Sequence, residues 1–517
     1  MGIKRITNIA QVLTEEGLGF LIAGQGNHPS SDLGATEAPT KDVAIAARFR
    51  KVCERLGPTF IKFGQVLALR RDVFSDAFCA ELGKLHSSVP PFASAEAVRI
   101  IETELTAKIS DVFCAFDENP VAAASIAQVH FATLVTGEQV AVKVQRPDAG
   151  PSIRDDLDMI LSMSKWLDRL FSTYREAMVH GMAQEFATMT AKELNFLEEA
   201  SVAVELKAAL AVEPDVYIPT IYRKFCTTRV LVLERLVGHR LDHFKSERDV
   251  LEKGFDPKKI AKTMLKLQIR QAYEIGLLHA DMHPGNVFIL EGGRVGLIDF
   301  GMNIRVTKET REGMQRALRL RASGRYEECF DVFLTVFSTP PEADVRAMKK
   351  ELIAFARAND AKPLSEMSLG KALIEESRIG RKYGATGPAD LMIIARGLLT
   401  VEGIALHLCP GFSPYAELHG IFSDLTRERF TPGRMASTWS ELLPDFVEAL
   451  EMTPELSKTL FRVRRNLAST NGLAEFLERE GFFARPGKGS NRNAGGALIL
   501  AAVIVGYLLA WLQIKFG

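Results

Sequence analysis

The 517-residue sequence predicts an α+β protein with two lobes, a smaller one built around a sheet and a larger one that is mainly helical. Residues 113–144 alternate apolar and polar side chains between turn signals, which predicts three strands in hairpin order. Residues 287–290 and 295–298 read as short apolar strands joined by a Gly-Gly turn. After residue 302 the pattern is almost wholly helical to about residue 470. A chain of this length exceeds one compact core, so we expect two or more domains.

The stretch that organises these elements is residues 278–302, which has the layout of a phosphoryl-transfer site. Asp281 is followed five positions later by Asn286, as in the catalytic loop of protein kinases, and Asp299 opens a DFG motif. An Asp on a loop can accept the proton of an attacking hydroxyl group. An Asn and a second Asp can hold Mg²⁺ against phosphate oxygens, at a separation fixed by the intervening hairpin. We therefore predict a bilobal, protein-kinase-like fold with ATP or ADP and Mg²⁺ as cofactors.

The N-terminal third precedes this fold with helices. Residues 3–13 carry apolar side chains at helical spacing, which favours a helix packed on the protein and leaves a membrane-surface helix as the alternative. Residues 24–43 are small, polar and rich in helix breakers, and they read as a linker. Residues 43–112 form a helical extension that contains KFGQ, where Lys62 and Gln65 share one face of a helix. By composition alone, both would be surface residues.

The predicted small lobe carries the parts that hold nucleotide phosphates in kinases. A loop between the first two strands covers the phosphates there, and the third strand brings a lysine to them. In this sequence the loop is rich in small residues other than glycine, namely Ala122, Ala123, Ala124 and Ser125, and the strand lysine is Lys143. Alanine restricts the backbone more than glycine does, so this loop should be a stiffer cover with less room for phosphate.

A helix with four polar or acidic positions follows a longer helical insert than kinases place at this point. Its Glu193 and Glu199 lie six residues apart, about 120° around a helix axis, so they should meet different partners. One of them can pair with Lys143. Residues 228–236 then form a buried strand that includes Glu234 and runs into Val237-Gly238, as a kinase hinge does.

Composition excludes several other functions. Lys+Arg and Asp+Glu both number 64, so the chain has no basic excess and nucleic acid is not an expected partner. The six cysteines are scattered without a C-x-x-C pair, which disfavours zinc and a disulfide framework and favours reduced thiols.

The C-terminal run is the candidate membrane anchor. Residues 494–512 have no charged side chain and are just long enough to span a hydrocarbon core. Arg485, Lys488 and Arg492 precede the run and only Lys515 follows it, so the positive-inside rule keeps the large domain cytoplasmic. A buried C-terminal helix is the alternative. The predicted organisation is therefore an N-terminal helix and linker, a helical extension, a small lobe with a helical insert, a large lobe and a transmembrane helix, at 1–42, 43–112, 113–238, 239–475 and 494–512.

Taken together, the motifs resemble the UbiB/ADCK family of atypical kinases, which are required for ubiquinone (coenzyme Q) biosynthesis. The resemblance rests on five motifs: KFGQ at 62–65, PVAAASIAQVH at 120–130, VAVK at 140–143, HADMHPGN at 279–286 and DFG at 299–301. The K-x-G-Q signature and the alanine-rich loop are the most specific of these, because ordinary kinases have neither.

The resemblance implies a role for each candidate residue. It implies that Lys143 pairs with Glu199, and that Lys62 pairs with Glu193 to draw the N-terminal helices across the site. Asp281 would be the catalytic Asp. The remaining implied roles are metal binding by Asn286 and Asp299, nucleotide contacts by Ala122, Ala123, Ala124, Ser125, Lys143, Glu199 and Glu234, and regulation by Lys62, Gln65 and Glu193.

Three positions depart from the family pattern. The family's E-x-D reads Glu193-Leu194-Asn195 here, which removes the second acidic side chain. The family's R-P-D after K-x-G-Q reads Arg70-Arg71-Asp72. Bacterial members often carry two C-terminal transmembrane helices, whereas this sequence predicts one.

The resemblance implies an ATPase or small-molecule kinase at the bacterial cytoplasmic membrane, with its kinase domain on the cytoplasmic side. Its expected partners are membrane lipid, prenylated quinone precursors and quinone-biosynthesis enzymes. Two alternatives stay open. One is a kinase-fold scaffold that binds nucleotide and organises other enzymes or lipid without turnover. The other is a small-molecule kinase of the aminoglycoside or choline type, which the K-x-G-Q block and the apolar C-terminal run disfavour.

Overall fold

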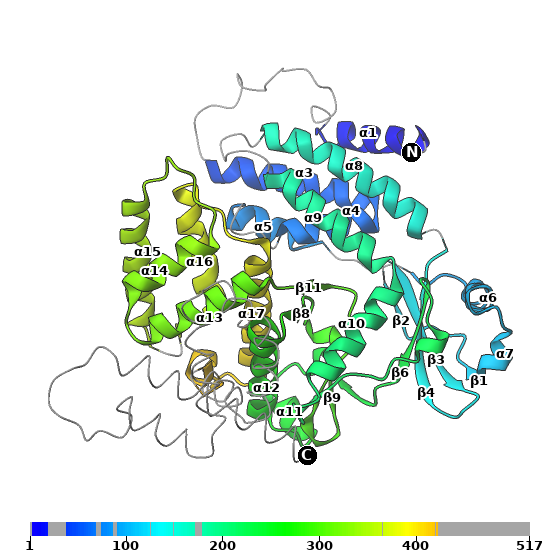
Figure 1. Ribbon diagram of the computed structural model, residues 1–517. Helices are drawn as coiled ribbons and strands as arrows, with labels where there is room; N and C mark the ends of the chain where they lie inside the picture. The colour runs from blue at the N-terminus through cyan, green and yellow to red at the C-terminus, as the bar shows by residue number, and fades with distance from the viewer. Residues whose placement is uncertain are drawn as a thin grey trace, which may run out of the picture. The chain divides into compact units, whose positions relative to one another are not determined.

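The computed structural model describes most of the chain up to residue 421 (Figure 1). The described residues are 3–18, 38–68, 74–85, 90–124, 126–147, 149–170, 178–363, 366–418 and 420–421. Contacts divide the chain into two units, Met1–Leu418 and His419–Gly517, and nearly all that follows concerns the first. Ser125, residues 70–72 and the predicted transmembrane helix at 494–512 lie outside the described residues.

The small lobe is an antiparallel sheet with a helix layer on each face. Its strand order is β1-β3-β4-β6, and β2 pairs with β3. Valines of β4 and β6 pack under α6 (Ser94–Leu105), while Phe196 and Ala200 of α10 (Phe196–Ala209) cover the other face. The strands are β1 (Phe113–Phe116), β2 (Ala122–Ala123), β3 (Ala127–Leu134), β4 (Gln139–Gln145) and β6 (Val230–Glu234). Residues 113–144 were predicted to form three strands, but they form four, because Ala122 and Ala123 of the predicted loop pair with β3 as β2.

The large lobe is mainly helical, with short strands around the predicted catalytic stretch. α12 (Pro257–Arg270) continues into one π-turn and then into β8, which pairs with β11, while β9 and β10 form the predicted hairpin. The strands are β5 (Val216–Tyr217), β7 (Gly238–Arg240), β8 (Leu277–His279), β9 (Val287–Leu290), β10 (Val295–Leu297) and β11 (Asn303–Arg305). The other helices are α7 (Ile109–Val112), α11 (Glu247–Glu252), α13 (Lys308–Ala322), α14 (Tyr326–Val336), α15 (Val345–Asp360), α16 (Leu369–Lys382) and α17 (Ala389–Leu408).

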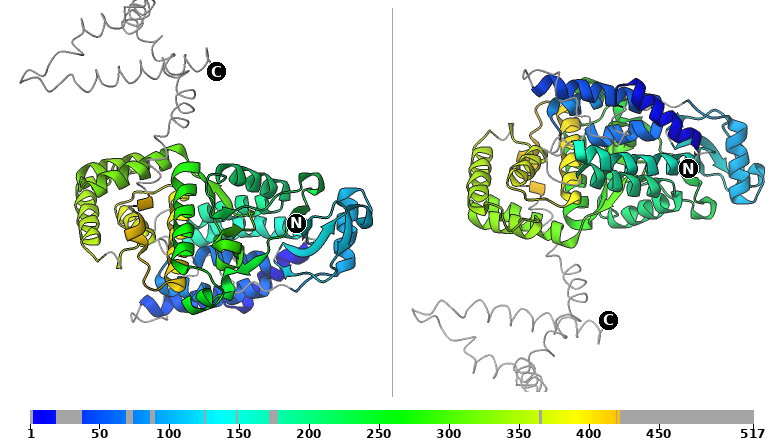
Figure 2. Two further views of the ribbon diagram at one scale, coloured as in Figure 1. Left: turned by 90° about the horizontal axis from the view of Figure 1, so that it is seen from below. Right: turned by 90° about the horizontal axis from the view of Figure 1, so that it is seen from above.

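The N-terminal helices and the helical insert share one hydrophobic core. Seen from above, they lie side by side as one layer (Figure 2). The layer consists of α1 (Ile3–Glu15), α3 (Ala38–Leu56), α4 (Pro58–Ala68), α5 (Asp76–Leu82), α8 (Ala149–Leu170) and α9 (Met178–Glu193). We call these six helices the helical cap. The insert, predicted as part of the small lobe, thus packs with the extension. α3 also begins at Ala38, inside the predicted linker.

The N-terminal helix packs on the protein. Ile9, Val12 and Leu13 are at most 4% exposed and belong to the core of the helical cap. Their spacing puts them on one face of α1. The expectation of a packed helix is therefore confirmed for the described side chains of this face.

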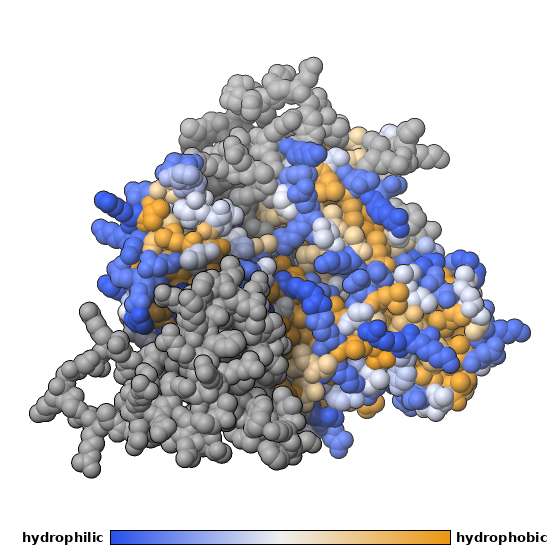
Figure 3. Space-filling view, in the orientation of Figure 1, coloured by the Kyte–Doolittle hydropathy of each residue, from blue (hydrophilic) through white to orange (hydrophobic). Residues whose placement is uncertain are grey.

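Among the described residues, α17 is the one helix long and apolar enough to cross a membrane by length and composition. In the fold it is a core helix, because 67% of its apolar window is buried against the rest of the chain. It packs between α12 and α16. Elsewhere the hydrophobic surface on the face shown in Figure 3 forms patches broken by hydrophilic side chains.

Gly64, the glycine of KFGQ, lies where α4 packs closely against its neighbours. A Cβ at this position would lie 2.4 Å from Leu85 Cδ1 and 3.2 Å from Cys53 Sγ. The glycine is therefore required for the close approach of α3, α4 and the turn after α5. Gly181 in α9 offers a matched comparison, because a Cβ there would meet nothing within 4 Å.

We expect Gly64→Ala and Gly181→Ala to change stability in opposite directions. Alanine in a helix is favoured over glycine by about 0.5–1 kcal/mol, so Gly181→Ala should raise the free energy of unfolding by that amount. At Gly64 the clash should outweigh this gain and lower it by about 1–3 kcal/mol. Denaturant unfolding of both variants beside the unsubstituted protein measures the difference. Equal stabilisation by both would show that the helical cap repacks freely around Gly64.

Candidate functional site

The centre of the site is an ammonium group held by two carboxylates. Lys143 on β4 donates to Glu199 Oε1 and Oε2 of α10, at 3.0 and 2.9 Å, and to Asp299 Oδ1, at 3.1 Å. Its Nζ also lies 5.3 Å from the centre of the Phe196 ring. These contacts join the sheet, α10 and the DFG segment, and they include the lysine–glutamate pair that the resemblance implies.

Burial and mutual attraction set the protonation of this cluster. Burial alone would lower the pKa of Lys143, but Asp299 and Glu199 outweigh it and hold the pKa above its usual range. Burial raises the pKa of Glu199 to about 7, against the opposing effect of Lys143. The pKa of Asp299 stays below its usual range because Lys143 more than offsets its desolvation. The two carboxylates therefore favour the charged form of Lys143.

The DFG segment is locked onto α10 by its backbone. Phe300 N–H donates to Glu199 Oε1 at 3.2 Å, and the buried Phe300 ring packs edge-on against His279. Asp299 has a φ of 59°, in the left-handed region that non-glycine residues rarely adopt. Gly301 N–H donates to Asp299 Oδ1 at 3.3 Å. The strained backbone thus aims the Asp299 carboxylate at Lys143.

The catalytic loop is positioned by a buried histidine. Asp281 N–H donates to His279 Nδ1 at 3.2 Å, so the ring proton is on Nε2, which lies 3.2 Å from the Ile298 carbonyl and donates to it. Burial lowers the pKa of His279, which keeps this neutral tautomer. His279 N–H in turn donates to Gln271 Oε1 at 2.7 Å. The side chain of Asp281 itself is 38% exposed and available to a substrate.

Asn286 is oriented by the same loop. Its Nδ2 donates to the Asp281 carbonyl at 3.0 Å and lies 3.4 Å from Asp281 Oδ2. Because the nitrogen faces the loop, Oδ1 is the atom that a metal ion could use. Ile298 N–H donates to the Asn286 carbonyl at 3.0 Å, which holds Asn286 beside the segment that carries Asp299. Two protein oxygens suit Mg²⁺, which takes its other ligands from phosphate and water.

The helical cap reaches the site through Glu193 at the end of α9, which forms an ion pair with Lys62 of α4 within the cap. Burial raises the pKa of Glu193, an effect that Lys62 opposes. Glu193 Oε1 is buried and has no hydrogen-bond partner among the described residues. Glu193 Cγ would lie 3.7 Å from a Cβ at Gly301, so the cap touches the DFG segment. Gln65 instead donates to the Leu85 carbonyl at 3.0 Å, within the cap.

Asn195, which replaces the family's second acidic residue, has a structural role at the start of α10. Its side chain accepts from Leu197 N–H at 3.2 Å and caps the helix. An Asp would cap equally well, so the replacement keeps the cap and removes one negative charge.

The alanine-rich loop is a tight hairpin fixed by an arginine. Ala124 N–H donates to the Ala127 carbonyl at 2.8 Å and closes the turn. Arg146 donates from Nε to the Ala124 carbonyl at 3.0 Å and from Nη2 to the Pro90 carbonyl at 2.7 Å. Its guanidinium also stacks over Phe92, 5.6 Å from the ring centre. Arg146 therefore clamps the predicted phosphate cover to the segment that leaves the helical cap.

Glu234 ends β6, and its side chain is occupied by residues of the segment 217–220, which begins at β5 of the large lobe. It accepts from Tyr217 Oη at 2.7 Å and from Thr220 N–H at 2.9 Å. The Glu234 carboxylate thus fixes residues 217–220 to the end of β6. A contact between Glu234 and a nucleotide would therefore have to use its backbone atoms.

Three residues that position the site were not predicted from the sequence. His279 and Gln271 orient the catalytic loop, and Arg146 fixes the alanine-rich loop. His279 and Arg146 stand two and three residues from Asp281 and Lys143, inside or next to the recognised motifs. Their roles depend on partners far along the chain, which motif spacing does not give.

Comparisons with known proteins identify two family domains in this chain. Residues 84–332 match the model of the ABC1 atypical kinase-like domain, and residues 354–413 match the UbiB helical domain. The chain is 30% identical over 473 residues to a Pseudomonas aeruginosa protein named "Probable protein kinase UbiB", which covers 90% of this chain and 85% of the relative. A protein of the same name from Shewanella halifaxensis is 31% identical over 449 residues, 85% of this chain and 81% of the relative.

The chain belongs to the UbiB family. A solved chain from Mycobacterium tuberculosis, Rv3197 in complex with erythromycin, aligns at 23% identity and a TM-score of 0.46, over 67% of this chain and 84% of that one. For this UbiB-family chain, the matched kinase-like domain spans the small lobe and the catalytic loop, and the matched helical domain spans α16 and α17 with the C-terminal part of α15.

The clamp at Arg146 generates a prediction about nucleotide affinity. Admitting phosphates beneath the alanine-rich loop requires the loop to yield, and the two Arg146 hydrogen bonds oppose this. Arg146→Lys should therefore tighten ATP binding, on the order of tenfold for one lost charge-assisted bond, and leave adenosine binding unchanged. Isothermal titration with both ligands measures this.

Arg235→Lys is the matched control for this variant. Arg235 stacks over Phe131 in the same lobe, 3.8 Å from the ring centre. We expect Arg235→Lys to bind ATP as the unsubstituted protein does. Weaker ATP binding by Arg146→Lys would show that the clamp supports the phosphate cover and does not restrain it.

Proposed function

We propose that this UbiB-family chain is an atypical kinase or ATPase that binds Mg-ATP and supports ubiquinone biosynthesis at the membrane, where it acts on or extracts prenylated quinone precursors. The single observation that carries the proposal is the assembled set around Lys143. Four elements distant in sequence bring Lys143, Glu199, Asp299, Asn286 and Asp281 to one site. If the site had no nucleotide-dependent role, nothing would explain why several charged side chains are buried together here.

Each side chain has a defined task in this mechanism. Mg-ATP, when bound, supplies the phosphoryl group. Asp299 and Asn286 Oδ1 would hold the metal, and Lys143 would contact the phosphates while Glu199 fixes its direction. Lys143 now bonds to Asp299 directly. With Asp299 holding the metal, the Lys143 ammonium would turn from Asp299 toward the phosphates, because like charges repel. Asp281 would accept the proton of the attacking hydroxyl group or water.

A nucleotide-binding scaffold without turnover is the second candidate, and the closed arrangement of the site favours it. Lys62 and Glu193 join α4 and α9 of the helical cap beside the DFG segment, and Arg146 fixes the phosphate cover. In a scaffold these contacts would report nucleotide binding to partner enzymes. The complete set with Asp281 favours chemistry instead, because a scaffold has no use for a hydroxyl-directed carboxylate.

Localisation at the cytoplasmic membrane, with the kinase domain on the cytoplasmic side, belongs to the same proposal. It rests on residues 494–512 and their flanking charges, which lie outside the described residues. The implied partners are membrane lipid, prenylated quinone precursors and quinone-biosynthesis enzymes. Quinone and intermediate profiling in a deletion strain, complemented with the unsubstituted protein or with Asp299→Asn, tests the cellular role.

The metal role of Asp299 predicts that nucleotide stabilises the fold only when Mg²⁺ is present. At a hundredfold excess over Kd, binding should stabilise the protein by about 2.7 kcal/mol, and Asp299→Asn should lose this stabilisation. Thermal shift with ATP, with and without Mg²⁺, measures it. Asp281→Asn is the control within the site, since it should keep the shift and lose turnover. A full metal-dependent shift in Asp299→Asn would remove Asp299 from the metal site.

The ion pair between Lys62 and Glu193 predicts a gating role. Lys62→Ala should fold, change nucleotide preference or autophosphorylation, and abolish quinone production in the cell. The substitution also leaves Glu193 buried without its counter-charge, which can lower stability. The double variant Lys62→Ala/Glu193→Gln removes the buried charge but does not restore the ion pair. It should therefore regain stability and keep the altered nucleotide preference. Normal quinone levels and nucleotide selectivity in Lys62→Ala would mean that Lys62 is a surface residue without a gating role.

A further inference from the structure

Two polar side chains of the AQVH motif, Gln128 and His130, are buried at core positions of the small lobe. Both lie on β3 and are fully buried. They share one face of this strand with Ala132 and Leu134, which belong to the hydrophobic cluster between the sheet and α6. Apolar side chains would fit such positions at lower cost, because buried polar groups need hydrogen-bond partners. The partners of Gln128 and His130 therefore indicate what the pair does.

Gln128 and His130 form a continuous chain of hydrogen bonds. Phe92 N–H donates to Gln128 Oε1 at 3.0 Å, and Gln128 Nε2 lies 2.9 Å from His130 Nε2. An amide N–H can only donate, so Oε1 faces Phe92 and Nε2 donates to the His130 ring. The ring proton is then on Nδ1, which donates to the Asp117 carbonyl at 2.9 Å. Burial lowers the pKa of His130, which favours this neutral tautomer. The chain thereby fixes residues 90–92, which we call the strap, to the sheet.

The strap is also the point to which Arg146 ties the alanine-rich loop. Arg146 donates to the carbonyls of Pro90 and Ala124, and its guanidinium stacks over Phe92. Gln128 therefore holds the strap at the Phe92 amide, while Arg146 joins the strap to the loop at the Ala124 carbonyl. The restraint that Arg146 places on the phosphate cover depends on a strap that Gln128 keeps in position.

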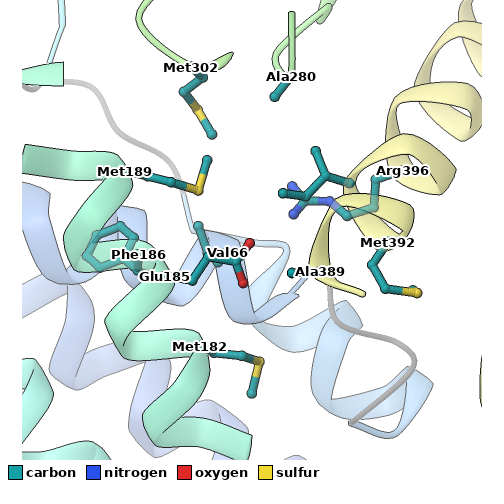
Figure 4. Close-up of a pocket in the computed structure, with 11 residues that line it drawn as sticks. Val66, Met182, Glu185, Phe186, Met189, Ala280, Met302, Ala389, Met392 and Arg396 are labelled. Carbon is teal, nitrogen blue, oxygen red and sulfur yellow. The ribbon is translucent and has the colours of Figure 1, made fainter. Parts of the chain in front are cut away.

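The cavity beside the catalytic loop does not supply room for nucleotide phosphates. It lies between α4, α9 and α17 and is bordered by Ala280 and Met302 (Figure 4). Its volume is about 30 Å³, which is room for about one water molecule. Phosphates would instead enter beneath the alanine-rich loop, so the attachment of this loop decides how readily the site admits them.

We propose that Gln128 and His130 are positioning residues for the phosphate cover, and that they act through the strap and Arg146. The inference rests on the proposed function and deepens it by naming what restrains the cover. The hydrogen bonds of the pair end on the strap and on the Asp117 carbonyl, so neither side chain needs to touch the nucleotide. Loss of the bond to the strap should free the groups that Arg146 holds, and the cover should then yield to phosphates more easily.

Isothermal titration with Mg-ATP and with adenosine tests this role. Gln128→Met keeps the length of the side chain and removes its hydrogen bonds. It should bind Mg-ATP about threefold to tenfold more tightly, as expected for one lost hydrogen bond, and bind adenosine unchanged. His130→Phe keeps an aromatic ring against Phe116, whose centre lies 5.0 Å from that of His130, but leaves the Gln128 amide free to turn. It should change the affinity for Mg-ATP in the same direction.

The double variant Gln128→Met/Arg146→Lys tests whether the pair acts through Arg146. It should bind Mg-ATP no more tightly than the tighter-binding single variant, because both substitutions release the same loop. Unchanged Mg-ATP affinity in Gln128→Met or in Arg146→Lys, effects of opposite sign, or additive effects in the double variant would each overturn the proposal.

Glu102→Met is the matched control in the same lobe. Glu102 Oε1 accepts from the Ile109 amide at 3.0 Å, so this variant also deprives one backbone N–H of its side-chain acceptor, but outside the strap. It should bind both Mg-ATP and adenosine as the unsubstituted protein does. Tighter Mg-ATP binding by Glu102→Met, equal to that of Gln128→Met, would show a general loosening of the lobe and would overturn the assignment to the strap.

Hydrogen exchange separates this inference from the proposed function, because it needs no nucleotide. Ala124 N–H donates to the Ala127 carbonyl at 2.8 Å and closes the loop. Gln128→Met should raise the exchange rate of this amide, Glu102→Met should not, and unchanged protection of α12 would show that both variants fold. If the unsubstituted protein binds no Mg-ATP, the proposed function fails, whatever the Ala124 amide shows. If Mg-ATP binds but Gln128→Met changes neither Ala124 exchange nor Mg-ATP affinity, the positioning role fails and the proposed function stands.

Discussion

The contact between Lys143 and its two carboxylates is the interaction on which the rest of the site depends. An ammonium group in a cleft is costly unless opposite charges surround it, and Glu199 and Asp299 come from elements more than 50 and 150 residues away. Their meeting fixes α10 against the sheet, and through the Phe300 amide it fixes the DFG segment against α10. The same pairing places the left-handed Asp299 where a metal would bind. Stability and function therefore use the same atoms at this point.

The sequence was informative where a motif is local and less so where packing is long-range. Residues 278–302 gave the catalytic loop, the hairpin and the DFG segment, because spacing along the chain determines these elements. The alanine-rich loop was only partly predicted, since pairing of Ala122 and Ala123 with β3 depends on a partner strand. The helical insert, placed within residues 113–238 from the sequence, packs with the N-terminal extension. Its apolar face could pack on any core, and nothing in its own pattern names α3 and α4 as partners.

This shared core explains how a distant extension can act on the site. α4 carries Lys62, and α9 carries Glu193, while α8 and α9 pack with α4 in one hydrophobic cluster. If α4 moves, the other helices of the helical cap should therefore move with it. Gly64 keeps the layer compact by admitting Leu85 and Cys53 close to the α4 backbone. In the large lobe, His279 supports the catalytic loop as Gly64 supports the helical cap. Gly64 does so because it is small, and His279 because it is buried and neutral.

The replacement at Asn195 bears on the charge balance of the whole site. Glu193, Glu199 and Asp299 supply three carboxylates against the two ammonium groups of Lys62 and Lys143. Burial raises the pKa of both glutamates, which shows that the negative charges are already difficult to accommodate. A fourth carboxylate next to Glu193 would add repulsion that only a bound cation could relieve. Asn195 caps α10 without this charge, so the ion pair between Lys62 and Glu193 can hold α4 against α9 before any metal arrives.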